Sequence, residues 1–586
     1  MKQFLKLTFA SALGLILGCL SLFAIIGIIA SSGEDENIKL SEAHILKLEL
    51  SGSIQDRVAD MSFDPLAEIM GNRETALGLN DILNNIIKAK NDPNIKGIYL
   101  EMGYLNAGFA TIEEIRNALL DFKESGKFIT SYSEYYSQRA YYLASVANTI
   151  CLYPEGALEL KGLNSTVMFY TDALKKIGIE PQIIRHGKFK SAVEPFMLTE
   201  MSEANREQVE TFMGSIWDQF LINVSENRNI TKEALNKIID NFDIKTPRDA
   251  KKLGLVDELF YRDQIQNHLT QLMEKEKFDD LKFISHSKYK NVKNENARTK
   301  FKKDKIAVIY AQGEIESGEG NETTIGSERI SKAIRKARLD EKVKAIVLRV
   351  NSPGGSALAS DVIWREMTLA KAAKTVVVSM GDVAASGGYY IACDADRIYA
   401  SPNTITGSIG VFGIMMSFQE LFTDKLGLTF DQVKTNKFAD LGSVNRPLTK
   451  EEYSIIHASV VDVYNTFTSK VAEGRNMTQN EVDAIGQGRV WSGTNAMDIN
   501  LIDKYGGLHE AIKGAAELAE MEEYRLLELP EQKDPFQQIL EELETGFSTS
   551  IMKYNLGDEY KYYKALNDIK NLKGIQARMP FQFTID

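Results

Sequence analysis

The sequence is poor in the residues that carry most nucleophilic and metal chemistry. Its 586 residues include only six histidines and three cysteines. No histidine lies in a setting rich in small residues or glycine, and only His186 has other candidate polar groups beside it. A serine–histidine–aspartate triad is therefore disfavoured. Three cysteines make no disulfide framework, and no cysteine/histidine cluster has metal-ligand spacing, so neither a metal nor another cofactor is expected.

Positively charged residues are outnumbered by acidic ones, 69 against 81. The formal net charge is −12, and no stripe of lysine and arginine with interleaved aromatic residues is present. Proteins that bind nucleic acid usually carry such a basic surface. Nucleic acid is therefore not expected as a partner.

Charge is absent altogether from one run near the amino terminus. Lys2 and Lys6 precede an uncharged stretch from Leu7 to Ala30, and acidic residues follow it. A bilayer is crossed by about 20 residues, and the positive flank stays in the cytoplasm. We expect residues 1–33 to be a cytoplasmic stub and a single membrane anchor. A cleaved signal peptide is the alternative, although its apolar region is usually only about 7–15 residues long.

A serine between a strand and a helix is the candidate nucleophile. The β-branched, apolar run Thr375 to Met380 predicts a buried parallel strand, and Tyr389 to Ala395 has apolar residues at helical spacing. Ser386 lies between them, flanked by alanines and glycines that let another backbone or a substrate approach closely. The pattern is not Gly-x-Ser-x-Gly, which excludes the nucleophile elbow of α/β-hydrolases. The alternative is an ordinary helix N-cap.

With histidine disfavoured, a lysine is the remaining base that could activate Ser386. Burial disfavours the charged ammonium group and can bring the pKa of a lysine toward the operating pH. The chain must therefore supply a suitable lysine.

Much of the chain consists of two copies of one internal repeat. The run from Tyr389 to Pro402 aligns with the run from Tyr141 to Pro154 at an offset of 248 residues, and Asp340 to Leu348 aligns with Asp92 to Leu100 at the same offset. Two further matches follow in the same order with slips of one residue. Each copy alternates strand and helix, which predicts an α/β fold with a parallel sheet covered by helices.

Composition suggests the limits of the two copies. We expect a first, degenerate repeat at residues 40–273, a polar linker at 274–304 and a second repeat at 305–530. Residues 531–586 have no counterpart in the first copy and carry helical spacing around Phe536 to Leu543. We expect this C-terminal extension to pack on the body or on a neighbouring molecule.

The differences between the copies point to the chemistry, because shared residues are expected to be scaffold. At the position of Ser386 the first copy has Gln138. The second copy also has an Asn-Ser-Pro-Gly-Gly turn after a strand, which the first copy lacks. Such a turn can direct a backbone N–H outward to stabilise an oxyanion. The candidate oxyanion-hole residues are Gly354, Gly355 and Gly387.

Three motifs together carry a family resemblance. They are Gly-Lys-Phe-Lys-Ser-Ala-Val-Glu-Pro-Phe at 187–196, Asn-Ser-Pro-Gly-Gly at 351–355 and Ser-Gly-Gly-Tyr-Tyr at 386–390. With them, nearly the whole chain resembles the signal peptide peptidases of the protease IV type, in their long form. The resemblance implies a tandem duplication of a Clp-protease/crotonase-like β-α superhelix unit behind an N-terminal transmembrane helix.

The same resemblance implies a membrane-anchored serine endopeptidase with a serine–lysine dyad. Ser386 would be the nucleophile, Lys190 the general base, and Ser408 a hydroxyl that orients the lysine. It further implies a homotetramer in the inner membrane of a bacterium, with the catalytic body on the periplasmic side. Its substrates would be cleaved signal peptides that remain in the membrane and other unfolded apolar peptides.

The duplication separates two neighbouring lysines. Lys188 has a counterpart in Lys437, whereas Lys190 is replaced by Ala439 in the second copy. If the copies share scaffold, Lys188 is structural and Lys190 is available for chemistry.

Two other functions remain open. A crotonase-type acyl-CoA enzyme also uses glycine-rich oxyanion loops but needs no serine nucleophile. A non-catalytic membrane scaffold, in which one degenerate copy supports the other, needs neither. Trapping of Ser386 by a serine-directed phosphonate distinguishes these functions from a serine peptidase.

Overall fold

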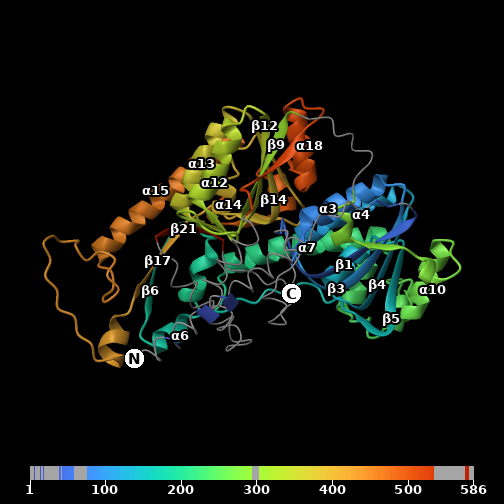
Figure 1. Ribbon diagram of the computed structural model, residues 1–586. Coiled ribbons are helices and arrows are strands. Elements are labelled where there is room, and N and C mark those ends of the chain that lie inside the picture. Colours follow the sequence, from blue (N-terminus) through green and yellow to red (C-terminus); the bar gives the residue numbers. More distant parts are fainter. Residues whose placement is uncertain are drawn as a thin grey trace.

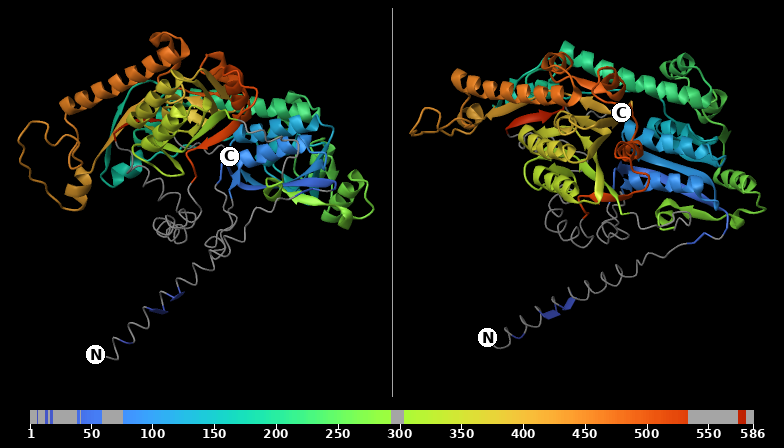
Figure 2. Two further views of the ribbon diagram at one scale, coloured as in Figure 1. Left: turned by 45° about the horizontal axis from the view of Figure 1, so that its top comes forward. Right: turned by 90° about the horizontal axis from the view of Figure 1, so that it is seen from above.

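The computed structural model describes most of the chain, namely residues 6, 13–14, 17–18, 39–40, 42–58, 76–292, 303–532 and 574–579. Within these residues, two α/β bodies lie side by side (Figures 1 and 2). The first is coloured blue to green and the second yellow to red. A third sheet contains strands from both halves of the chain.

The first body is built on a parallel sheet in the order β2-β1-β3-β4-β5-β7, with β8 beside β1. Its central strands are long and rich in buried apolar residues such as Leu48, Ile98 and Leu100, but they also carry charged residues, including Lys47 and Glu101. The strands are β1 (His44–Gln55), β2 (Leu77–Gly78), β3 (Ile95–Asn106), β4 (Phe128–Tyr136), β5 (Thr149–Leu158), β7 (Glu258–Leu259) and β8 (Phe283–Ser285). The helices of this half are α3 (Leu79–Asn91), α4 (Phe109–Lys123), α5 (Gln138–Ala144), α6 (Thr171–Lys176), α7 (Glu203–Arg228), α8 (Lys232–Asp240), α9 (Pro247–Lys252), α10 (Arg262–Leu272) and α11 (His286–Tyr289), with 3₁₀ turns η1 (Ser191–Phe196) and η2 (Phe278–Asp280).

The second body repeats this plan with the order β18-β16-β14-β12-β9-β20, and β15 lies between β14 and β19. Only the β16–β18 pair in it is antiparallel. The strands are β9 (Lys305–Gln312), β12 (Val343–Ser352), β14 (Thr375–Ala385), β15 (Arg397–Ala400), β16 (Ile405–Gly407), β18 (Val490–Ser492), β19 (Lys504–Tyr505) and β20 (Arg525–Leu529). The helices are α12 (Ser327–Leu339), α13 (Ala357–Lys371), α14 (Gly387–Tyr390), α15 (Lys450–Arg475), α16 (Gln479–Ile485), α17 (Gly493–Asp498) and α18 (Leu508–Leu518), with a π turn η3 (Leu421–Lys425).

Local contacts repeat from one body to the other. Helices α7 and α15 both have 26 residues and end at a left-handed asparagine. The last residue of each helix makes the same ion pair, Arg228 to Asp257 at 2.7 Å and Arg475 to Asp503 at 2.6 Å. The left-handed asparagine that follows each helix donates its N–H to a carbonyl of the last turn, which would otherwise lack a partner. The duplication inferred from the sequence is therefore visible in the fold.

The third sheet joins the two halves in the order β11-β10-β13-β21-β17-β6. Strand β6 of the first half pairs antiparallel with β17 of the second, in a register that places Arg185 opposite Phe412. This pairing carries the chain that follows β6 into the second body. The strands not yet described are β6 (Glu180–Arg185), β10 (Glu314–Glu316), β11 (Thr324–Gly326), β13 (Gly354–Ser356), β17 (Phe412–Ser417) and β21 (Ile575–Arg578).

Two more features hold the bodies together. Helix α7 extends along both (Figure 2), and its Ser215 hydroxyl lies 2.7 Å from that of Ser492. Arg349 of β12, which is fully buried, donates to Asp56 at 2.9 Å and to Glu114 at 2.7 Å across the junction. Both carboxylates belong to the first half and are themselves buried. The junction therefore contains a buried ionic cluster as well as apolar packing.

The stretch 274–304 differs from the expected linker. Its first part completes the first body, because β8 pairs with β1 and Tyr289 of α11 is fully buried, with its hydroxyl 2.9 Å from Asp92. A few apolar residues, Leu281, Ile284 and Tyr289, suffice to bury a segment whose composition is mostly polar. Residues 293–302 lie outside the described chain.

Two expectations from the ends of the chain fall largely outside the described residues. The uncharged run from Leu7 to Ala30 is one, and the helical spacing around Phe536 to Leu543 is the other. Among the residues that are described, no helix combines the length and the apolar character needed to cross a membrane.

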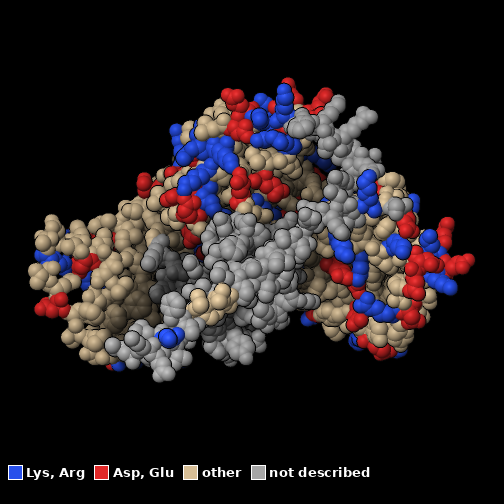
Figure 3. Space-filling view, in the orientation of Figure 1, with Lys and Arg blue, Asp and Glu red and all other residues tan. Residues whose placement is uncertain are grey.

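The surface of the two bodies carries charges of both signs (Figure 3). The flank formed by β6 and β17 shows few charged side chains in this view, whereas the loop after η3 carries charges of both signs at its far end. Large apolar side chains are exposed there, including Leu426 (58% exposed), Phe430 (51%) and Val433 (100%).

Candidate active site

Ser386 lies where β14 ends and α14 begins, as the sequence predicts. Its backbone has φ 55° and ψ −112°, a conformation that non-glycine residues rarely adopt and that is often found at functional sites. The Ser386 N–H donates to the carbonyl of Gly407 at 2.8 Å, which fixes this turn against β16. The side chain makes no N-cap hydrogen bond. The N-cap interpretation is therefore wrong, and α14 is shorter than the helical spacing of Tyr389 to Ala395 suggested.

Lys190 meets Ser386 within a single chain. Its Nζ lies 2.9 Å from Ser386 Oγ, 3.0 Å from Ser408 Oγ and 3.2 Å from the Ser408 carbonyl. All three side chains are fully buried. Burial without a neighbouring carboxylate lowers the pKa of Lys190 well below its ordinary value. A neutral amine in this position can accept the proton of the serine hydroxyl.

The backbone of Lys190 is clamped against the second body. The Phe189 N–H donates to the Gln487 carbonyl at 2.9 Å. Gly488 has φ +86°, and a Cβ at this position would lie 2.6 Å from Lys190 Cβ. Only glycine fits such an approach. Reasoning from the sequence did not find Gly488, because nothing in its local pattern indicates a partner almost 300 residues earlier in the chain.

Gln208 is a second residue that the sequence did not reveal. Its amide donates to Ser191 Oγ at 2.8 Å and to the Phe189 carbonyl at 3.1 Å. Its carbonyl oxygen accepts the N–H of Val490 at 3.1 Å. Gln208 thus connects the segment around Lys190 with strand β18.

Ser408 directly follows β16 and also has a positive φ, 49°. Its N–H donates to the Arg489 carbonyl at 2.7 Å, and its hydroxyl can donate to the Gly488 carbonyl at 3.3 Å. In that arrangement Ser408 Oγ presents a lone pair to Lys190 Nζ. This geometry suits a hydroxyl that holds a lysine in one orientation.

The glycines proposed for the oxyanion hole lie close together. An added Cβ at Gly354 would come within 2.7 Å of the Gly387 N atom. Gly354 has φ +96°, and its N–H donates to Ser352 Oγ at 3.1 Å, whose hydroxyl in turn donates to the Gly313 carbonyl at 2.6 Å. The Gly354 N–H is therefore engaged in this structure.

Strand β21 passes directly over these glycines. It is antiparallel to β13, with Ala577 opposite Gly355, and the Met579 N–H donates to the Pro353 carbonyl at 2.7 Å. On its other edge it pairs with β17 (Figure 1). The Ala577 carbonyl oxygen would lie 3.0 Å from a Cβ at Gly387. Ser386 is 0% exposed in this structure, whereas the sequence suggested an accessible serine.

In the first copy, Gln138 stands at the position that aligns with the candidate nucleophile Ser386. Gln138 accepts the backbone N–H groups of Lys161 and Gly162, each at 3.0 Å, and donates to the Gly162 carbonyl at 3.2 Å. These hydrogen bonds hold the loop that contains Lys161 and Gly162. Lys188 is exposed, with its Nζ 5.1 Å from the centre of the Phe189 ring, and Lys437 lies at the same distance from Phe438. This repeated contact fits a structural lysine.

The other chemistry-bearing residues lie elsewhere. His186 packs on the ring of Tyr464 with centroids 4.4 Å apart. Within the described residues, no group of three or more His, Cys, Asp or Glu side chains is placed to hold a metal ion.

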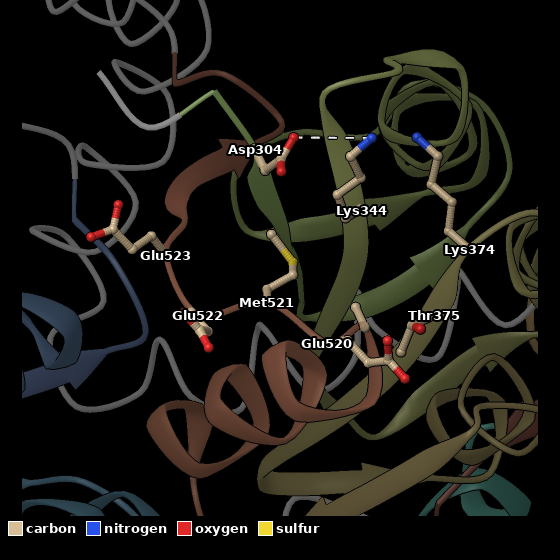
Figure 4. Close-up of a pocket in the computed structure, with 9 residues that line it drawn as sticks. Asp304, Lys344, Lys374, Thr375, Glu520, Met521, Glu522 and Glu523 are labelled. Atoms are coloured by element: carbon tan, nitrogen blue, oxygen red, sulfur yellow. Dashed lines mark ion pairs between the residues drawn. The ribbon is translucent and has the colours of Figure 1, made fainter. Parts of the chain in front are cut away.

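A shallow depression lies at the opposite end of the second sheet from Ser386 (Figure 4). Asp304 and Lys344 form an ion pair across part of it at 3.9 Å. Lys374 is engaged with backbone carbonyls, those of Ala337 and Asp340, at 2.9 and 2.6 Å. The depression contains none of the groups of the serine–lysine site.

Comparison with known proteins gives consistent matches over most of the chain. The model of peptidase family S49 matches residues 121–276 and again 368–522, which confirms the duplication, and the Clp protease model matches residues 298–406. Protease 4 of Salmonella typhi is 37% identical over 86% of this chain and 82% of its own. The chloroplastic serine protease SPPA of Arabidopsis thaliana is 33% identical over 92% of this chain and 78% of its own. A putative signal peptide peptidase SppA of Enterococcus faecium is 36% identical over 30% of this chain and 52% of its own.

Proposed function

Because this chain belongs to peptidase family S49 and is a serine-type peptidase, we propose that it degrades cleaved signal peptides and other unfolded apolar peptides through a dyad of Ser386 and Lys190. The observation that carries this proposal is the 2.9 Å distance between Lys190 Nζ and Ser386 Oγ in a fully buried setting. Substrates of this kind are suggested by the name of the Enterococcus relative.

In the proposed mechanism, neutral Lys190 accepts the hydroxyl proton while Ser386 Oγ attacks the carbonyl carbon of the peptide bond. The resulting oxyanion accepts a hydrogen bond from the Gly387 N–H and a second one from the Gly355 N–H. The carbon–nitrogen bond then breaks, and the Lys190 ammonium group returns its proton to the leaving amine. A water molecule, deprotonated by Lys190, hydrolyses the acyl-serine ester and restores the dyad. Ser408 keeps the amine directed at Ser386 in both steps.

The enzyme would act at a membrane. The uncharged run from Leu7 to Ala30, with lysines before it and acidic residues after it, supports a single anchor with a cytoplasmic N-terminus. The catalytic body would then lie on the extracytoplasmic side of the bacterial inner membrane, where cleaved signal peptides remain embedded.

The apolar flank supports assembly with further copies, as a tetramer. Leu426, Phe430 and Val433 expose large side chains close together in the sequence, in the loop that adjoins the sparsely charged flank of β6 and β17 (Figure 3). Contiguous exposed apolar surface of this kind is typical of protein interfaces.

A direct test is trapping of the nucleophile. A serine-directed phosphonate should label the protein at Ser386, and loss of hydrolysis of a labelled apolar peptide should parallel the labelling. The Ser386→Ala variant is the control, and it should neither be labelled nor hydrolyse the peptide. Full peptide hydrolysis by a protein whose Ser386 is completely phosphonylated would contradict the proposal. An absence of peptide hydrolysis together with turnover of an acyl-CoA thioester would favour the crotonase-type alternative.

The rate of hydrolysis should rise with pH and then level off, with an apparent pKa well below the value of about 10.4 for a free lysine. Burial lowers the pKa of Lys190. Below that pKa the amine is protonated and cannot act as a base, and above it the amine is neutral and can. Measuring kcat/KM for one peptide across the pH range tests this, with protein stability followed in parallel. A rate that climbs steadily to about pH 10 would indicate an unshifted lysine.

A further inference from the structure

Strand β21 has the position and direction that a bound peptide would need. It lies between β13 and β17 and is antiparallel to both, so that backbone groups on both of its edges face a strand. Proteases and peptide-binding domains often hold an extended peptide by adding it to a sheet in this way. Here the added strand comes from the chain's own C-terminal region, at residues 574–579.

The register of β21 relative to Ser386 is specific. Ala577 lies opposite Gly355, and its carbonyl oxygen is close to Gly354 and to Gly387, the residue that follows Ser386. Of the strand's residues, Ala577 has a fully buried side chain. In this register Ala577 would correspond to P1, the residue whose carbonyl is attacked, and Arg578 would correspond to the next position, P1′.

The side chain at P1′ has a charged partner. Arg578 forms an ion pair with Glu314 of β10, and the Arg578 side chain is only 20% exposed. Glu314 itself lies on the strand next to β13, where Ile315 is opposite Gly355. A carboxylate fixed at this place in the sheet would attract a positive side chain at P1′ and repel a negative one.

We propose that residues 574–579 lie in the peptide-binding groove in the register of a substrate, and that Glu314 selects a basic residue at P1′ while the P1 position takes a small one. This inference rests on the proposed peptidase function of the same site. It also implies that β21 must leave the groove before another peptide can enter, because β21 already occupies the edge of β13 with which that peptide would pair.

The test compares two peptides that differ at one position. One contains Ile-Gln-Ala-Arg-Met, the sequence of residues 575–579, and the other has Glu in place of Arg. The full-length protein should cut the first between Ala and Arg and prefer it by about three- to tenfold in kcat/KM, as expected for a partly exposed ion pair combined with repulsion in the second peptide. The Glu314→Gln variant should reduce this ratio toward one, and Glu314→Arg should invert it.

The ratio of the two peptides is the informative quantity. Replacing Glu314 also loosens Arg578 and can raise activity toward every peptide, but this effect cancels in the ratio. Glu316→Gln, which removes a carboxylate two residues along β10, should leave the ratio unchanged. Mass spectrometry of the products gives the cut position, and a cut at another bond of the first peptide would overturn the register.

The outcomes separate this inference from the proposed function. Hydrolysis of both peptides at equal rates, unaltered in Glu314→Arg, would overturn the role of Glu314 and leave the peptidase intact. Absence of hydrolysis of either peptide, together with no phosphonate labelling of Ser386, would instead overturn the peptidase function itself.

Discussion

Lys190→Ala and Ser386→Ala are each expected to lower kcat for peptide hydrolysis by about a thousandfold or more. Lys190 Nζ and Ser386 Oγ are 2.9 Å apart and, in the proposed mechanism, share one proton, so the loss of either group would remove the activated nucleophile. The double variant should be no less active than either single variant, because residues that act as one unit are not additive. Steady-state kinetics with one labelled peptide measure all three variants.

Lys188→Ala is the matched control, because Lys188 is two residues away, exposed, and packed on Phe189. It should retain nearly full activity. Thermal unfolding must show that the Lys190→Ala protein is folded. Substantial activity in a folded Lys190→Ala protein, combined with its loss in Lys188→Ala, would refute the assignment of the base.

Arg349→Met should lower the free energy of unfolding by about 3–5 kcal/mol, because it leaves two buried carboxylates without their cation. Asp56 and Glu114 both receive hydrogen bonds from Arg349, and all three side chains are nearly inaccessible to water. Since the carboxylates belong to the first body and Arg349 to the second, the variant should weaken the junction between them. Denaturant unfolding monitored by intrinsic fluorescence provides the measurement.

Two further variants make this result specific. Lys305→Ala removes an ion pair with Asp340 that is partly exposed, and it should cost no more than about 1 kcal/mol. Adding Asp56→Asn and Glu114→Gln to Arg349→Met should restore part of the lost stability, since the uncompensated charges are then gone. A change below about 1 kcal/mol in Arg349→Met would show that water reaches the carboxylates.

The sequence predicted those features of the fold that leave a local or a repeated pattern. The apolar, β-branched run before Ser386 predicted a buried strand, and matches at one offset predicted the duplication. Ser386 was proposed from its local pattern and Lys190 from the family resemblance, and the comparison of the copies supported both because Gln138 and Ala439 replace them. The two side chains lie together in the structure, although their roles remain predictions.

The features that the sequence did not predict depend on pairing between distant segments. Strand β21 has only four residues, and its partners lie more than 150 residues earlier in the chain. Gly488 and Gln208 matter because of what they touch, and no pattern around them indicates this. The same cause explains the segment at 274–304, whose few apolar residues dock on β1 despite a polar composition.

The pairing of β6 with β17 also has a consequence for the order in which the enzyme is made. Lys190 precedes Ser386 by 196 residues, and β17 follows both. At a synthesis rate of about 5–20 residues per second, Ser386 is added to the chain roughly 10–40 s after Lys190. If the two residues form the proposed dyad, a nascent chain that ends within this interval contains the lysine without the serine and would have no peptidase activity.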